Sequence, residues 1–303
     1  MRRIYKILNT LELVIIVLVF GCQKPAPVEI IDEQDDSKYI EVTALGNTND
    51  SIYVSSGVDT TGLTGLESSK HFARMIFAGV RFDRTDRSGN IIATESILAE
   101  AIFLDKTKPI QQNGQLLTYT SFDIGDLKIN SDSLIKYQRQ IRLLMRDSVI
   151  GYVYRLARTY NYQQSYIWNA SGSNSIGSFQ IPFTTASPIR VLNLDPDTIH
   201  ISKPLYLKWQ CSNPIVNIII SGEEDIPYSQ RRLRPILQFR VNNNKGEITL
   251  PVKILQMIPV KLFQRFQFTF ASDSKFTSTV SGYPDEVLIY SASIHNILLT
   301  VRP

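Results

Sequence analysis

The strongest constraint on the fold is a series of short segments near the C-terminus in which apolar and polar side chains alternate. In PLYLKWQ (204–210) every second residue is apolar, and QRFQFTFAS (264–272) repeats the pattern with three phenylalanines. Side chains of a strand point alternately to its two faces, so a period of two predicts half-buried strands. Further segments of this kind are IVNIIIS (215–221), PILQFRV (235–241), GEITLP (246–251), EVLIYSA (286–292) and IHNILLTV (294–301). Seven or eight such strands separated by turn residues predict an all-β sandwich.

The first half of the chain shows the same pattern less regularly. FARMIFAGVRF (72–82) alternates except at Arg74, which predicts a half-buried strand. SFDIGDLKIN, SVIGYVYRLA and QSYIWNASG add β-branched and aromatic residues, which favour strands. SLIKYQRQIRLLMR (133–146) has apolar residues near helical spacing, so a short helix and a pair of strands both remain open there.

The length of the chain suggests more than one hydrophobic core. With 303 residues, 43% of them apolar, it can bury one large core or two ordinary ones, and we expect two. The expected division is a signal peptide at 1–21, a lipidated cysteine and flexible tether at 22–66, a β-rich domain at 67–184 and a second sandwich at 185–303.

The first 22 residues combine a basic start, a short apolar run and a cysteine. Arg2, Arg3 and Lys6 precede the apolar segment 13–21, which is far shorter than the roughly 20 residues needed to cross a bilayer as a helix. This arrangement is typical of a secretory signal. The bulky Val19 and Phe20 do not fit an ordinary small-x-small cleavage site.

The end of this segment resembles the lipobox of bacterial lipoproteins. Val19, Gly21 and Cys22 match that motif, and Phe20 is unusual for it. The resemblance implies that Cys22 becomes the lipidated first residue of the mature chain and anchors the protein outside the cytoplasm. An ordinary cysteine and an uncleaved anchor remain as alternatives. The next residue is Gln23, not the Asp that retains some lipoproteins in the inner membrane, which favours the outer membrane of a Gram-negative bacterium.

The residues after Cys22 predict a tether. QKPAPVEIIDEQDDSKY (23–39) contains two prolines and several acidic residues, a composition that disfavours core burial. The segment 40–69 indicates a loop with one strand near DSIYVSS. Without residues 1–21 the chain has 29 basic and 27 acidic residues, a net charge near +2. This balance gives no support to nucleic-acid binding.

The C-terminal half also resembles the immunoglobulin-like modules found at the C-terminus of many bacterial envelope lipoproteins. The matching positions are Pro204, Leu205, Leu207, Trp209, Gly246, Ile248, Leu250, Pro251 and Leu255. Upstream, SYIWNASGSNSIGSFQIPF (165–183) resembles the junction that precedes such a module. The resemblance implies a fold and a cellular setting, and it transfers no active site.

The sequence contains few residues arranged for chemistry. Cys22 and Cys211 are the only cysteines, and lipidation of Cys22 would leave Cys211 a free structural thiol. His71, His200 and His295 have no partner at a metal-site spacing. We therefore expect no metal site, no cofactor and no catalytic residues.

Four charged stretches have ordinary interpretations that we favour. DRTDRSGN (83–90) has the wrong oxygen spacing for a calcium loop and is typical of a hairpin turn. SGEEDIP (221–227) and Asp195–Asp197 are typical of solvated acidic loops. Arg231, Arg232 and Arg234 are candidates for phosphate or carboxylate binding, but the neighbouring acidic residues favour local ion pairs.

The segment GYVYRLARTYNYQQSY is unusually rich in tyrosine. Exposed aromatic rings on sandwiches stack against sugars, whereas core packing is the default for such large side chains. The candidate glycan-binding residues are Tyr152, Tyr154, Tyr160, Tyr162 and Tyr166.

Three functions stay open from the sequence. The leading hypothesis is a non-catalytic, membrane-anchored envelope lipoprotein that binds or positions another envelope or extracellular component. The second is a glycan-binding surface lipoprotein. The third is an envelope hydrolase, which requires a polar pocket with a titratable group of altered pKa.

Overall fold

The chain folds almost entirely into β-sheet. The structure, a computed structural model, describes residues 40–44, 71–86, 88–112, 114–143, 146–156, 161–194, 198–224, 232–242 and 245–303. The one helix within these ranges is α2, Val252–Leu255. The predicted all-β class is confirmed.

One large sheet of eleven strands dominates the described residues. In spatial order its main path is β1 (Ile40–Ala44), β15 (Arg232–Asn242), β14 (Ile215–Glu224), β17 (Phe266–Ser278), β18 (Val287–Arg302), β2 (Ala73–Thr85), β3 (Ile91–Gln112), β8 (Arg146–Leu156) and β7 (Ile135–Leu143). Two further strands attach to it: β12 (Thr198–His200) pairs with β18, and β4 (Gln115–Ser121) pairs with β3. Because β7 and β8 pair antiparallel, the segment 133–146 follows the strand alternative.

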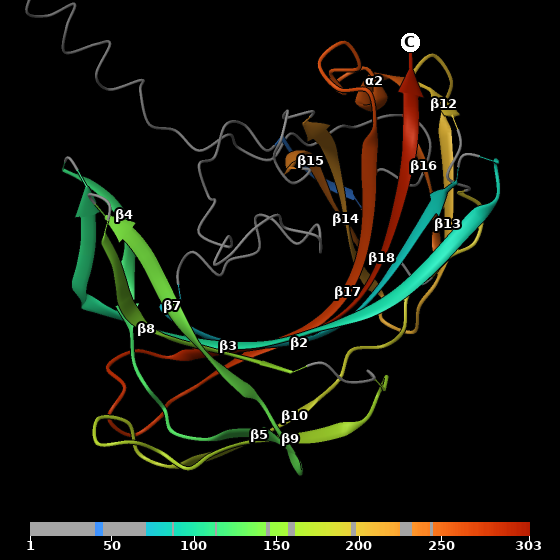
Figure 1. Ribbon diagram of the computed structural model, residues 1–303. Helices are drawn as coiled ribbons and strands as arrows, with labels where there is room; N and C mark the ends of the chain where they lie inside the picture. The colour runs from blue at the N-terminus through green and yellow to red at the C-terminus, as the bar shows by residue number, and fades with distance from the viewer. Residues whose placement is uncertain are drawn as a thin grey trace, which may run out of the picture.

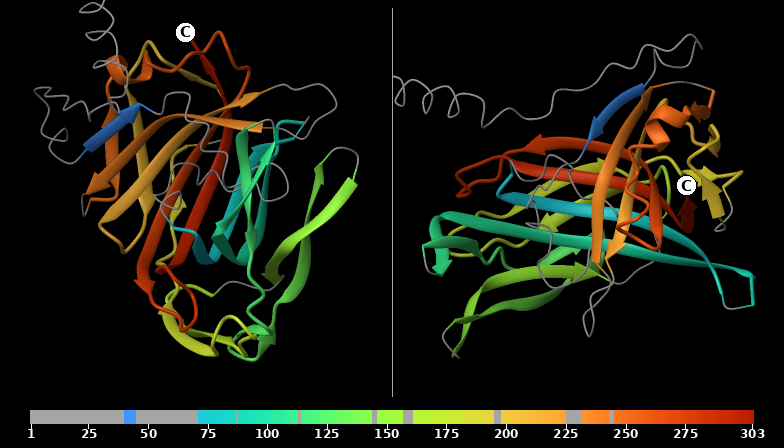
Figure 2. Two further views of the ribbon diagram at one scale, coloured as in Figure 1. Left: turned by 90° about the vertical axis from the view of Figure 1, so that its left-hand side faces the viewer. Right: turned by 90° about the horizontal axis from the view of Figure 1, so that it is seen from above.

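The large sheet bends into a U-shaped trough (Figure 1). Two small sheets pack against its convex side. The first contains β10 (Phe179–Thr184), β9 (Ser165–Ala170), β5 (Leu127–Ile129) and β6 (Asp132–Ser133). The second contains β11 (Arg190–Val191), β13 (Leu205–Gln210) and β16 (Glu247–Leu250). At one end of the trough, the β2–β3 hairpin extends past the neighbouring strands (Figure 2).

The first hydrophobic core lies between the large sheet and the first small sheet. It is rich in aromatic side chains, and Trp168 is fully buried within it. The ring of Phe183 stacks on the rings of both Tyr166 and Trp168, with centroids 5.7 Å apart in each pair. Offset stacking of this kind adds to the stabilisation that burial of the rings already provides.

The second core lies between the large sheet and the second small sheet. Phe266, Phe268 and Phe270 of β17 all point into it, as their alternation predicts. Trp209 of β13 packs over Phe270 with ring centroids 6.1 Å apart. Of the positions of the immunoglobulin-like resemblance, Leu207, Trp209, Ile248, Leu250 and Leu255 are buried here and Leu205 is partly buried, while an immunoglobulin-like topology remains a prediction.

The two cores share strands of the large sheet and do not divide at one point of the sequence. β18 contributes Val287 and Ile289 to the first core, and Ile297 and Leu299 to the second. β18 also pairs in parallel with β2, so the last strand of the chain lies beside the second. The two halves expected at 67–184 and 185–303 therefore share one continuous sheet.

The central position of β2 corrects the prediction of a half-buried strand at 72–82. All residues from Ala73 to Val80 are buried. Met75 and Phe77 face the first core, whereas Ile76 and Ala78 belong to a smaller apolar cluster with residues of β17 and β18. A strand in the middle of a sheet can bury both of its faces, and the alternation then no longer predicts which side chains are exposed.

The loop between β2 and β3 is the predicted hairpin turn. The Asp86 carboxylate accepts hydrogen bonds from the backbone N–H groups of Ser88 (2.8 Å) and Asn90 (2.9 Å). Gly89 occupies the left-handed region with φ of +84°. Asp86 therefore stabilises the turn with the oxygens that a calcium loop would need.

Candidate functional site

Several sequence-predicted site residues lie outside the residues that the structure describes. They are the lipobox residues Val19, Phe20 and Gly21, the lipid-attachment residue Cys22, and Tyr160. Their roles stay predictions.

Two of the five candidate tyrosines are core residues. Tyr154 and Tyr166 are 1% and 4% exposed in the first core, so their rings cannot serve as an open platform for a sugar. Tyr152 is partly buried against the same core. The Lys136 ammonium lies 4.2 Å from the centroid of the Tyr152 ring, a cation–π contact that covers one face.

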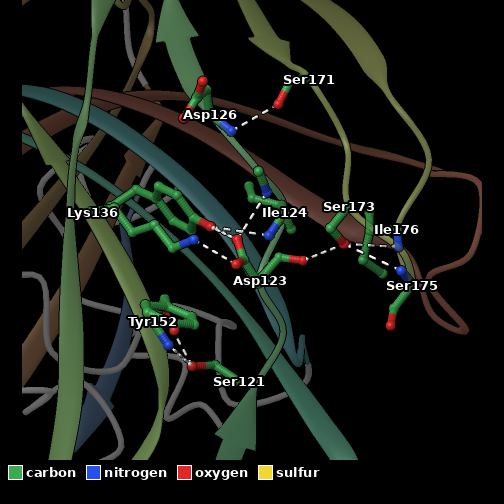
Figure 3. Close-up of polar contacts among 12 residues, drawn as sticks. Ser121, Asp123, Ile124, Asp126, Lys136, Tyr152, Ser171, Ser173, Ser175 and Ile176 are labelled. Carbon is green, nitrogen blue, oxygen red and sulfur yellow. Dashed lines mark hydrogen bonds and ion pairs between the residues drawn. The ribbon is translucent and has the colours of Figure 1, made fainter.

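Tyr154 belongs to a compact polar group around Asp123, which we call the Asp123 cluster: Asp123, Lys136, Tyr154 and Ser173. The Asp123 carboxylate accepts hydrogen bonds from the Tyr154 hydroxyl (2.9 Å), the Gly125 N–H (2.9 Å) and the Lys136 ammonium (2.5 Å). The Tyr154 oxygen in turn accepts the N–H of Ile124 (2.9 Å). Figure 3 shows Lys136 and Asp123 pointing toward one another across this group.

The Asp123 cluster also fastens the loop between β9 and β10. The Ser173 hydroxyl donates to the backbone carbonyl of Asp123 (2.7 Å) and accepts from the N–H of Ile176 (3.2 Å) (Figure 3). The Ser171 hydroxyl oxygen accepts the N–H of Asp126 (2.8 Å). Two loops from different parts of the chain are therefore held together by short side chains.

The pKa values of this cluster indicate a structural role. Burial raises the pKa of Tyr154 far above its usual value, and its bond to Asp123 raises it further, so the phenol keeps its proton. Burial acts to raise the pKa of Asp123 as well, but its hydrogen bonds and the charge of Lys136 outweigh burial and lower it. Tyr154 therefore stays protonated and Asp123 stays charged, and the two groups bind each other and their neighbours within the protein.

A second polar group lies between the two cores, and the sequence did not predict it. Ser291, Ser293 and His295 occupy alternate positions of β18 on the face that turns toward the small sheets, and each is 1% exposed. We call these three residues the polar seam. They accept backbone N–H groups from the segment that joins the small sheets: Ala186 to Ser291 (3.0 Å), Ile189 to Ser293 (2.9 Å) and Val191 to His295 Nδ1 (2.9 Å).

His295 uses both of its ring nitrogens inside the protein. Nδ1 accepts from Val191, and Nε2 lies 2.9 Å from Asp83 Oδ2, so Nε2 carries the proton and donates it to the carboxylate. Burial lowers the pKa of His295, and the interaction with Asp83 only partly offsets this effect. The imidazole is therefore neutral near pH 7, and it has no free lone pair with which to act as a general base on a substrate.

Arg81 and Glu95 complete the charges around Asp83. The Arg81 Nε donates to both carboxylate oxygens of Asp83 (3.0 and 3.3 Å), and its Nη1 lies 3.5 Å from Glu95. The two carboxylates of this region thus share one guanidinium.

Tyr162 is the candidate tyrosine that reaches the seam. Its side chain is 36% exposed, and its hydroxyl bonds to Ser293. Burial raises the pKa of Tyr162, the bond to Ser293 acts in the opposite direction, and nearby Glu95 raises it further. Tyr162 is therefore a protonated, half-exposed ring beside charged groups.

A groove of about 350 Å³ opens beside Asp83, between β11 and the end of the β2–β3 hairpin. We call it the Arg190 groove. Its lining residues are Arg81, Asp83, Ile91, Arg190, Val191, Leu192, Leu194 and Gln210. Charged and amide side chains therefore share the groove with aliphatic ones.

The seam carried a faint signal in the sequence. Ser291, Ser293 and His295 stand at the inward positions of a strand whose other inward residues, such as Val287 and Ile297, are aliphatic. Small polar residues in the inward register indicate buried hydrogen bonds. The alternation along β18 does not predict their partners, which lie 104 or 105 positions away in the sequence.

The other candidate residues give no site of their own. Among the described residues, no group of three or more His, Cys, Asp or Glu side chains could hold a metal ion. His200 is exposed and lies 3.3 Å from the carbonyl of Pro303. Cys211 is a free thiol, partly buried against the second core. Glu223 pairs with Arg265 at 2.7 Å. Asp195–Asp197 and Arg231 lie outside the described residues, and Arg234 is exposed.

Comparison of the chain with protein-family models, with curated proteins and with solved structures finds no match. In the described residues, no helix is both long and apolar enough to span a membrane.

Proposed function

We propose that the protein is a non-catalytic, lipid-anchored component of the bacterial cell envelope that binds or positions another envelope or extracellular component. The observation that supports binding over catalysis is the state of its buried titratable groups. His295 donates its proton to Asp83, and Tyr154 donates its proton to Asp123. Both side chains also accept a backbone N–H. A catalytic acid or base must reach its substrate, and these groups are already engaged.

The proposed anchor is Cys22, in the outer membrane of a Gram-negative bacterium. The pattern from Val19 to Cys22 and the acidic, proline-containing segment after it support this location. β1 begins at Ile40, so the chain between the lipid and the sheet spans at most roughly 60 Å when fully extended. The folded part would then work close to the membrane surface.

Metabolic labelling with a palmitate analogue in the native host tests the anchor. The chain offers a matched control, because Cys211 is its other cysteine. We expect label on the wild type and on Cys211→Ala, and none on Cys22→Ala. Absence of label from the wild type would exclude the anchor. Protease treatment of intact cells then distinguishes exposure at the surface from a periplasmic location.

A second candidate is glycan binding by the same anchored protein. Tyr162 favours it, because this ring is half exposed and stands beside Arg81 and Glu95, groups that hydrogen-bond to sugar hydroxyls. Tyr162→Ala should weaken retention of the full-length protein on an immobilised polysaccharide that it binds. Tyr137→Ala, a change of another exposed tyrosine far from the seam on β7, is the control. Equal retention of the two variants would remove Tyr162 from the binding surface.

A further inference from the structure

The Arg190 groove contains one arginine that has no direct ion-pair partner among the described residues. Arg190 is exposed, and no described residue forms a hydrogen bond or an ion pair with its guanidinium. Arg81, the other arginine of the groove, is held by Asp83 and Glu95. The charged residues of the lining are Arg81, Asp83 and Arg190, so the lining carries one net positive charge, and Glu95 lies close by on the far side of Arg81.

The chemistry of Arg190 narrows the class of ligand. A guanidinium presents a planar fork of donors that matches a carboxylate, and such paired hydrogen bonds are stronger than those between neutral groups. Gln210 is the cross-strand partner of Arg190, and both side chains project from the outer face of the second small sheet. The amide of Gln210 adds a donor and an acceptor next to the guanidinium.

The aliphatic residues of the groove suit a sugar ring, which has polar hydroxyl edges and apolar C–H faces. Leu192 and Ile91 are 52% and 53% exposed on the groove, and they offer aliphatic surface to the C–H face of a sugar ring. The volume of about 350 Å³ lies at the small end of ligand pockets, which hold small molecules and short saccharides.

An extended peptide fits this groove less well. β11 is the edge strand of its sheet, and a peptide that added to that edge would need its free backbone N–H groups. The N–H groups on the free side of β11 are already donated, that of Val191 to His295 and that of Ile189 to Ser293. The edge therefore has little hydrogen-bonding capacity left for a strand.

We propose that the Arg190 groove binds a carboxylate-bearing saccharide, with Arg190 holding the carboxylate, Gln210 binding an adjacent hydroxyl, and Leu192 and Ile91 packing on the ring. The inference rests on the glycan-binding form of the proposed function and names its ligand class and its site. It does not depend on the lipid anchor, which is tested by the labelling of Cys22.

An array of acidic oligosaccharides tests the groove. The array carries uronate, muramate and sialate saccharides, each beside its carboxyl-reduced neutral counterpart, and acidic peptides of similar charge. Full-length protein in detergent is applied as wild type, Arg190→Gln and Arg240→Gln. Arg240 is an exposed arginine of β15 outside the groove, so its variant has the same change of charge. Thermal unfolding of each variant confirms that it is folded.

We expect binding of at least one acidic saccharide and a loss of about tenfold or more on carboxyl reduction, because the charged hydrogen bonds are lost. Arg190→Gln should weaken binding of the same saccharide by a similar factor, and Arg240→Gln should leave that binding unchanged. Three outcomes overturn the proposal: no acidic saccharide binds, the neutral counterparts bind equally well, or both variants lose affinity alike. Binding of acidic peptides alone, dependent on Arg190, would assign the groove to a protein partner instead. Labelling of Cys22 without any array signal would leave the anchor intact and remove only the saccharide site.

Discussion

The Asp123 cluster and the region around Asp83 are built from similar parts but differ in what they leave open. Each has a carboxylate, a cation bound to it and an uncharged ring that donates to it: Lys136 and Tyr154 at Asp123, and Arg81 and His295 at Asp83. Around Asp123 the bonds close on the protein itself. Around Asp83 the bonds also close, but a groove with a second arginine lies directly beside them.

This difference shows that a buried polar cluster with shifted pKa values does not by itself mark a binding site. Both rings are buried with altered pKa values, yet each serves to fasten segments that meet at the large sheet. The Asp123 cluster joins two loops beside the first core, and His295 binds the segment that connects the two small sheets. The capacity for ligand that we propose lies in the neighbouring Arg190, whose guanidinium has no direct partner among the described residues.

The largest effect is expected from breaking the packing at the Asp123 cluster. Gly125 has a φ of +76°, and a β-carbon there would overlap the carbonyl oxygen of Gly172 and the hydroxyl of Ser171. Gly125→Ala should therefore lower the free energy of unfolding by about 3 kcal/mol or more, through backbone strain and a clash with rigid backbone. Urea denaturation of the full-length protein measures the change.

Gly89→Ala provides the matched control for that substitution. Gly89 also has a positive φ, but no heavy atom lies within 4 Å of the position of an added β-carbon. Only the conformational strain remains there, about 1 kcal/mol. Equal losses at the two glycines would show that the contact of the two loops contributes little.

The second largest effect is expected at the seam. His295→Ala removes a buried ring and leaves the N–H of Val191 and the Asp83 carboxylate each without a partner, which should cost about 3 kcal/mol. Ser293→Ala removes the hydroxyl that binds the N–H of Ile189 and the Tyr162 hydroxyl, and should cost about 1 to 2 kcal/mol. Denaturant unfolding of both variants ranks them. A smaller loss in His295→Ala than in Ser293→Ala would contradict a central role for the imidazole.

The local alternation of the sequence predicted much of the strand structure. Phe266, Phe268 and Phe270 are buried on one strand, and Leu207 and Trp209 are buried on another, as their spacing requires. These positions are decided by side-chain direction alone, which depends only on neighbours along the chain.

The arrangement of the sheet could not be predicted in the same way. The parallel pairing of β18 with β2 joins segments about 200 residues apart, and nothing in either segment specifies the other. The seam depends on that pairing, because it places Asp83 beside His295. Tyr154 and Tyr166 could not be recognised as core residues for a related reason, because their strands turn them toward a core that only the packing of the two sheets defines.

A third prediction uses pH to separate the two regions. His295 has a folded-state pKa below its ordinary value of 6.5. As the pH falls through 6.5, the unfolded chain takes up a proton that the folded chain does not, so stability decreases until the lower folded pKa is reached. Asp123 also has a lowered pKa, and its contribution is lost only as the pH falls below its ordinary value of 3.8.

The measurement is the free energy of unfolding from pH 8 to pH 3 for the wild type and His295→Gln, with His200→Ala as the exposed-histidine control. The loss that begins near pH 6.5 should be absent from His295→Gln and present in the control. Arg81, Glu95 and Arg190 also face this region, and the partly buried Asp273, with its raised pKa, acts in the opposite direction at acid pH. The comparison is therefore made between variants at each pH. Parallel curves for all three proteins would exclude His295 as the titrating group.

The smallest effect on stability is expected at Arg190. This substitution tests most directly whether the region around Asp83, unlike the Asp123 cluster, has a group free for a ligand. Arg190 is exposed and makes no hydrogen bond or ion pair within the described structure, so Arg190→Gln should change the free energy of unfolding by less than about 0.5 kcal/mol. Arg81→Gln removes the guanidinium from both Asp83 and Glu95 and should cost about 1 kcal/mol, since the pair is only partly buried. Thermal and denaturant unfolding of the two variants tests this difference. A loss at Arg190 as large as at Arg81 would mean that Arg190 is bound by the protein and is not free for a ligand.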